Sequence, residues 1–112
     1  MAVAAAAVNV FQTITSVVGT STVGIYTAPV GYTGVVLLAQ VTNVGSSTQT
    51  ISFGHRRTGT DTEIVKDFPV PPKDTVSFLD GRLGLESGDI LVISGGSATD
   101  LKFTGSILET LK

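Results

Sequence analysis

One residue in three has a β-branched side chain, because the 112 residues include 15 Val, 7 Ile and 16 Thr. Branching at Cβ restricts χ1 in a helix and suits the pleated, half-buried surface of a sheet. Thirteen glycines and four prolines divide the sequence into short segments, and no window supports a helix of ten residues. The sequence therefore predicts an all-β fold.

Apolar or alternating segments recur about every ten residues, the spacing typical of a sandwich or jelly roll. We expect seven or eight strands in a single antiparallel β-sandwich of jelly-roll type. The expected strands cover residues 8–18, 23–26, 33–44, 48–54, 62–68, 75–79, 90–94 and 101–108, with a short extended piece at 83–85. Three prolines exclude a central strand at 69–72, and we expect the chain to cross between the sheets over residues 69–73.

The segment 33–44 is the most hydrophobic of these. Both of its faces begin apolar, which favours a central strand buried on both sides. The alternation places on one face Val35, Leu37, Ala39 and Val41, and at the start of the other Val36 and Leu38. In the segment 101–108, the inward face is expected to carry Leu101, Phe103 and Ile107.

The charges are distributed unevenly. Residues 1–54 contain no Asp, Glu, Lys, Arg or His, and all 16 charged residues lie between Arg56 and Lys112. A solitary soluble sandwich normally has charges at outward positions, where they favour solubility and block edge pairing. Neutral polar side chains lose their hydration at lower cost than charges. We expect other chains to cover much of the neutral half; a Thr-rich face that stays exposed, as in adhesins, is the alternative.

Length and composition exclude several classes of protein. A chain of this length forms one domain, and the absence of Cys excludes disulfides and thiolate metal sites. A net charge of -2 with one adjacent basic pair, Arg56 and Arg57, argues against nucleic acid as a partner. The apolar run at 2–8 is far shorter than the ~20 residues of a membrane span. Because no cationic residue precedes it, we interpret it as part of the mature chain.

The chemistry-bearing residues do not form a recognisable catalytic pattern. His55 is the single histidine, and we expect it exposed at a strand end beside Arg56. The acidic pairs Asp61/Glu63 and Asp67/Asp74 are interpreted as solvated turn residues, with acid-base work of the glycosidase type as the alternative. Asp80, Asp89 and Asp100 could bind Ca²⁺, but we favour plain hairpin turns. We therefore expect no enzyme activity, no metal and no cofactor.

Two tyrosines, Tyr26 and Tyr32, flank a Pro-Gly turn. They could form a small aromatic platform for a carbohydrate, but we favour packing at the sandwich edge with both hydroxyls in water.

Two blocks resemble a known group of proteins. The run IYTAPVGYTGVVLLAQVTNV at 25–44, and IVKDFPVPPKDTV at 64–76 followed by GRLGLESGDI at 81–90, are similar to small virion structural proteins of tailed bacteriophages, notably phages of aquatic bacteria. The resemblance covers about residues 22–108. It implies a β-sandwich component of the particle without catalytic activity. Among the possible roles we favour a capsid cement (decoration) protein, because a small neutral sandwich with an apolar N-terminal arm suits trimer formation on a capsid lattice. A neck, tail or fibre component, including a module that binds a host surface or glycan, is the alternative.

The resemblance and the charge pattern together give expected partners and contact residues. We expect residues 1–21 to form an N-terminal arm or strand for self-association and residues 22–112 to form the sandwich. The expected partners are the chain itself, as a homotrimer, and the major capsid protein or other virion subunits, which places the protein in the virion. The self-association residues are expected to be Val3, Val8, Val10, Phe11 and Ile14. Arginine suits bidentate pairing with carboxylates, so contacts with an acidic capsid surface are assigned to Arg56, Arg57 and Arg82.

Overall fold

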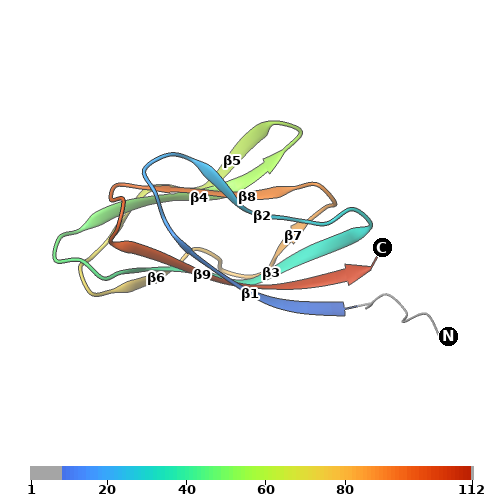
Figure 1. The fold of residues 1–112 in the computed structure, drawn as a ribbon, viewed down its shortest axis with the longest axis horizontal. Coiled ribbons are helices and arrows are strands. Elements are labelled where there is room, and N and C mark those ends of the chain that lie inside the picture. The colour runs from blue at the N-terminus through green and yellow to red at the C-terminus, as the bar shows by residue number, and fades with distance from the viewer. Residues whose placement is uncertain (1–8, 112) are drawn as a thin grey trace.

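The computed structural model describes residues 9–111, and these form nine strands in two antiparallel sheets packed face to face (Figure 1). The all-β sandwich is therefore confirmed. The short piece at 83–85 is itself a paired strand, which brings the number above the seven or eight expected. The strands are β1 (Asn9–Val17), β2 (Val23–Thr27), β3 (Tyr32–Asn43), β4 (Gln49–Arg57), β5 (Thr60–Val70), β6 (Thr75–Ser77), β7 (Leu83–Leu85), β8 (Ile90–Gly95) and β9 (Leu101–Leu111).

The first sheet has the order β1-β9-β3-β6, with β7 also paired to β3, and the second sheet has the order β2-β8-β4-β5. The strand β3 is central, as predicted, since it pairs with β9 on one side and with β6 and β7 on the other. The chain passes from β5 in the second sheet to β6 in the first through residues 71–74, which overlap the segment 69–73 where a crossing was expected. Pro69 lies in β5, an edge strand, where a missing N–H is tolerated.

The core lies between the two sheets and is built around three phenylalanines. Phe53 from β4 stacks on Phe78, with ring centroids 5.0 Å apart, and on Phe103 from β9, at 5.8 Å. The inward face of β9 is as predicted, because Leu101, Phe103 and Ile107 are all buried. These contacts join the first sheet to the second.

The predicted alternation of β3 is wrong in its first half. The register with β9 shifts between Val36 and Leu38, so that an additional residue is accommodated there. Such a bulge changes which face the following side chains occupy. As a result Val36 and Ala39 are both buried, whereas Leu37 is 38% exposed.

The turn end of the β4-β5 hairpin projects above the other strands of the second sheet in Figure 1. A Cβ atom at Gly54 would lie 2.2 Å from the carbonyl oxygen of Thr62, so the backbone of β5 lies directly on this residue and only glycine fits. The strand β4 also runs further than expected, to Arg57, which places His55 inside a strand rather than after it.

Residues 9–17 are an integral strand of the sandwich. β1 pairs with β9 over nine consecutive residues, from Asn9 opposite Thr110 to Val17 opposite Lys102, without a register shift. The boundary expected at residue 21 therefore does not separate β1 from the sandwich. Val3 and Val8, two of the expected contact residues, lie outside the described residues, and self-association through residues 1–21 stays a prediction.

Candidate functional site

The side chains of β1 divide cleanly between the two faces of the first sheet. Val10, Gln12, Ile14 and Ser16 are half-buried and face the core, whereas the odd-numbered residues 9–17 are exposed. The side chains of β9 also alternate between the two faces, but here the odd-numbered residues 101–109 are the buried ones. The even-numbered residues of β9 therefore share the solvent side with the odd-numbered residues of β1.

The register of β1, β9 and β3 arranges these outward residues in rows across the sheet, and we call them together the outer face. One row is apolar, and the next two consist of small or neutral side chains; the fourth contains the only charge. The rows are Phe11, Leu108 and Val35; Thr13, Ser106 and Leu38; Thr15, Thr104 and Gln40; and Val17, Lys102 and Thr42.

Large apolar side chains are exposed on the outer face. Phe11 is 72% exposed, Val17 is 54% exposed and the bulge residue Leu37 is 38% exposed. Single exposed apolar residues are ordinary, but a group of them beside uncharged neighbours marks an interaction surface. Lys102 is the one charged residue among the outward strand positions of this sheet in the part of the chain that the structure describes.

The second sheet has the opposite character. Its edge strand β5 contains Asp61, Glu63, Lys66 and Asp67, and Asp67 adopts a positive φ of 49°. Two register shifts interrupt its pairing with β4. Charges and bulges of this kind prevent an edge from adding another strand. The two faces of the sandwich therefore differ in charge and in regularity.

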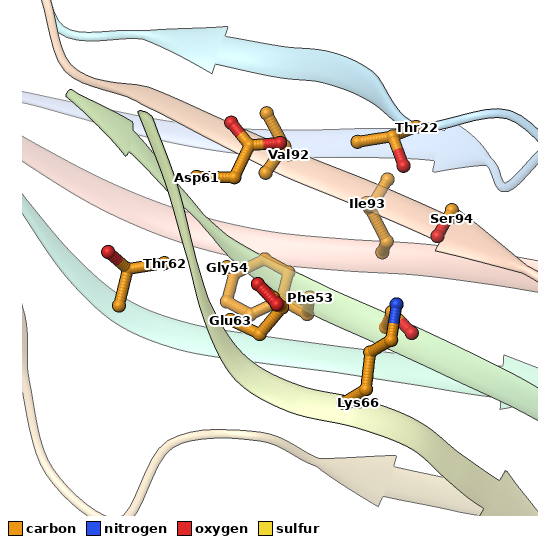
Figure 2. A pocket seen from close by; sticks show the side chains of 11 residues that line it. Thr22, Phe53, Gly54, Asp61, Thr62, Glu63, Lys66, Val92, Ile93 and Ser94 are labelled. Atoms are coloured by element: carbon orange, nitrogen blue, oxygen red, sulfur yellow. The ribbon is translucent and has the colours of Figure 1, made fainter. Parts of the chain in front are cut away.

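A small pocket of about 150 Å³ lies in the second sheet, beside its edge strand β5. Figure 2 shows its lining side chains, which come from β4, β5 and β8, with Thr22 from the loop before β2. Charged groups of both signs, Asp61, Glu63 and Lys66, surround it, together with the hydroxyls of Ser52 and Ser94. Its size and polarity suit water or a small polar molecule.

The three arginines assigned to docking have different surroundings. Arg56 forms an ion pair with Asp61, and Arg57 pairs with Asp89 and Glu86. Arg82 lies exposed between β6 and β7, and within residues 9–111 no ion pair involves it. A docking role for these side chains stays a prediction, and for Arg56 and Arg57 it would require a partner carboxylate to share an existing pair.

Asp89 organises the turn before β8. Its buried carboxylate, 3% exposed, accepts hydrogen bonds from Arg57 Nε and Nη2 and from the backbone N–H of Glu86. The hydrogen bonds from Arg57 hold the pKa of Asp89 below its ordinary value, against the opposing effect of burial. Asp89 was interpreted from the sequence as a hairpin-turn residue, but the turn that it stabilises connects β7 of the first sheet to β8 of the second and is not a hairpin.

His55 is not the exposed residue expected from the sequence. It is half-buried in β4, opposite Leu91 of β8, and its Nδ1 atom is buried without a hydrogen-bond partner among the described residues. The strand continues through His55 to the turn at 58–59. Because side chains alternate along this strand, the side chain of His55 points toward the inside of the sandwich, as those of Ile51 and Phe53 do.

Tyr26 also departs from its expected role. Its hydroxyl donates a hydrogen bond to Oε2 of Glu109, a buried carboxyl from the opposite sheet that is 5% exposed. Burial, and then the hydrogen bond and charge of Glu109, raise the pKa of Tyr26 well above its ordinary value. Tyr26 therefore joins the two sheets rather than presenting a hydroxyl to water, and the platform expected as an alternative lacks this member.

Replacing Tyr26 by Phe is expected to lower the free energy of unfolding by about 1–3 kcal/mol at pH 7, because the carboxyl of Glu109 loses a buried partner. The stabilisation from the neutral hydroxyl is complete below the unfolded-state pKa of about 10 and is lost as pH rises through the higher folded-state pKa. Denaturant midpoints measured from pH 7 to 11 should therefore fall more steeply for the wild type than for Tyr26→Phe. Parallel slopes would contradict the assigned hydrogen bond.

No group of three or more His, Asp or Glu side chains that could hold a metal ion occurs in residues 9–111. Across these residues we also find no helix with the length and apolar character to cross a membrane.

Comparison with known proteins gives structural neighbours only. No protein-family model and no curated protein sequence matches the chain. Among solved structures, a chain in the acidic stable capsid structure of Helicobacter pylori bacteriophage KHP30 superposes with a TM-score of 0.58 at 15% identity, over 94% of this chain and 89% of that one. A chain of the Bacillus endospore appendages, which form disulfide-linked pili, superposes with a TM-score of 0.53 at 18% identity, over the whole of both chains. At these identities the similarity shows a shared fold.

Proposed function

We propose that this chain is a non-enzymatic structural protein of a bacteriophage virion, of the capsid cement or decoration type. The observation that carries the proposal is the outer face of the first sheet, which combines exposed Phe11, Val17 and Leu37 with neutral polar neighbours and a single charge, Lys102. Such a surface can be buried against a protein subunit without removing several charges from water.

The proposed mechanism is mechanical. Each copy places its outer face on neighbouring shell subunits, and contacts that are weak singly add through avidity when one copy touches several subunits. A specific interface needs roughly 800 Å² from each partner. The β1-β9-β3 surface is formed by the three longest strands of the first sheet. Similar folds in a phage capsid structure and in pili support a role in an assembly.

A neck, tail or fibre component is the second candidate, and the similarity to a chain of endospore appendages favours it. The form of this second candidate in which the chain is a glycan-binding module has less support. Glycan binding generally uses exposed aromatic rings with a polar group available, whereas the hydroxyl of Tyr26 is bonded to Glu109 inside the sandwich. Contacts with shell subunits and contacts along a fibre would use the same outer face.

The proposal is tested by adding the purified chain to phage shells from which the endogenous copy has been removed. We expect co-sedimentation that saturates at a fixed number of copies per shell, with a rise in the temperature at which the shells open. Shells that bind none of it, while isolated tails or fibres do, would replace the cement role by the second candidate. The homotrimer expected from the sequence stays a prediction, and it is the alternative to the two-fold pairing proposed below.

A further inference from the structure

Among residues 9–111, no strand pairs with the outward edge of β1, and the strand itself has no feature that blocks pairing. Its nine residues contain no charge, no proline and no glycine, and its register with β9 is free of bulges. Natural sandwiches usually protect an edge of this length with charges, prolines or bulges, because exposed N–H and C=O groups recruit another strand. In this chain the edge strand β5 has such protection, whereas β1 does not.

The remaining edges are too short or too irregular to compete. β2 has five residues and a register shift between Gly24 and Tyr26, and β6 and β7 have three residues each. Of the edges formed by residues 9–111, β1 is therefore the long, regular and uncharged one.

The alternation of hydrogen-bonded and non-bonded pairs between β1 and β9 identifies which residues of β1 have their backbone N–H and C=O groups at the open edge. The N–H of Val18 donates to the carbonyl of Leu101, and the N–H of Val44 donates to the carbonyl of Asp100 on the other side of the same segment. Because antiparallel pairs alternate between bonded and non-bonded residues, the even-numbered residues of β1 bond to β9. The N–H and C=O groups of Asn9, Phe11, Thr13, Thr15 and Val17 are then turned toward the open edge.

We propose that β1 pairs antiparallel with β1 of a second copy, around a two-fold axis at Ile14, so that the first sheets of two chains become one continuous sheet. A strand without charges can pair with a copy of itself. In a charged strand, a two-fold axis would bring like charges close together.

The register centred on Ile14 matches side chains by type, and this favours it over the register centred on Thr13. On the outer face, Phe11 lies opposite Val17 of the partner, which is a pair of an aromatic and a β-branched residue. Thr13 lies opposite Thr15 of the partner, and both kinds of pair stabilise sheets. On the inner face, Ile14 lies opposite its own copy. A register centred on Thr13 would instead place Phe11 opposite the smaller and polar Thr15, and the exposed Val17 opposite the polar Asn9.

The axis of this pairing is perpendicular to the sheet, so the outer faces of both copies lie on the same side. Two neutral faces then form one surface twice as wide. The pairing itself does not depend on the proposed role in a virion, because it uses only the edge of β1.

Single cysteines test the axis directly, since the natural chain contains no Cys. At a two-fold axis in a non-bonded pair the Cα atoms are about 4.5 Å apart, within the range of about 4.4–6.8 Å for a disulfide. Ile14→Cys is expected to form a covalent dimer under mild oxidation. Gln12→Cys is the matched control on the same face of the same strand: in this register it lies opposite Ser16, about four residues from its own copy, and should remain uncrosslinked.

The wild-type chain provides a measurement that does not depend on the folding of a variant. Sedimentation should give twice the 11.5 kDa chain mass, and dilution should deprotect the amides of Phe11, Thr13, Thr15 and Val17 while those of the even-numbered residues stay protected. A monomer at all concentrations, a trimer, or equal crosslinking of Ile14→Cys and Gln12→Cys would overturn the pairing. A monomer that still binds shells would leave the proposed function intact, and a dimer that binds no shell would leave the pairing intact.

Discussion

Phe53→Ala is expected to lower the free energy of unfolding by about 3–5 kcal/mol, the cost typical of removing a buried aromatic ring. Phe53 is 1% exposed and stacks on both Phe78 and Phe103, so its removal leaves a cavity at the junction of the two sheets. Domains of this size have a total stability of about 5–15 kcal/mol. The substitution should therefore remove a large fraction of it.

Equilibrium denaturation with guanidinium measures this loss, and Phe68→Ala provides the matched control. Phe68 lies on the edge strand β5 and is 42% exposed, so we expect its replacement to cost less than half as much. Equal losses in the two variants would contradict the placement of the core around Phe53.

The strands were predictable because local sequence determines them. β-branched residues alternate with polar ones between Gly and Pro, and the inward residues of β9 followed directly from this alternation. The bulge beside Leu37 was not predictable, since it depends on how β3 pairs with β9, about 70 residues later in the chain. A shift of one residue there reverses the face of the following side chains.

The long-range polar contacts were also beyond the sequence. Tyr26 and Glu109 are 83 residues apart, and Arg57 and Asp89 are 32 residues apart. Neither pair has a local spacing that indicates contact. The Tyr26 hydroxyl was therefore expected in water and Arg57 was assigned to a partner, whereas the fold gives each of them a carboxylate of this chain.

The uneven charge distribution has a more specific meaning in the structure than in the sequence. Two strands of the uncharged half, β1 and β3, lie on either side of β9. The outward residues of β9 add only Lys102 to that surface. Another part of the uncharged half, β2 and the start of β4, lies in the second sheet, so the division is between two faces rather than between two halves of the chain.

The most direct measurement of the central claim compares shell binding by two threonine-to-lysine variants. Thr104 lies between Thr15 and Gln40 at the centre of the outer face, whereas Thr27 is an exposed position on the edge strand β2 of the second sheet. An unpaired charge placed in an interface costs several kcal/mol, and about 1.4 kcal/mol is a factor of ten in affinity.

Both variants should fold, because each substitution is at a surface position where changes are usually within about 0.5 kcal/mol. In co-sedimentation with stripped shells, Thr104→Lys should bind at least about 100-fold more weakly than the wild type, while Thr27→Lys should bind like the wild type. Wild-type affinity in Thr104→Lys, or its loss in Thr27→Lys alone, would contradict the assignment of the outer face as the docking surface.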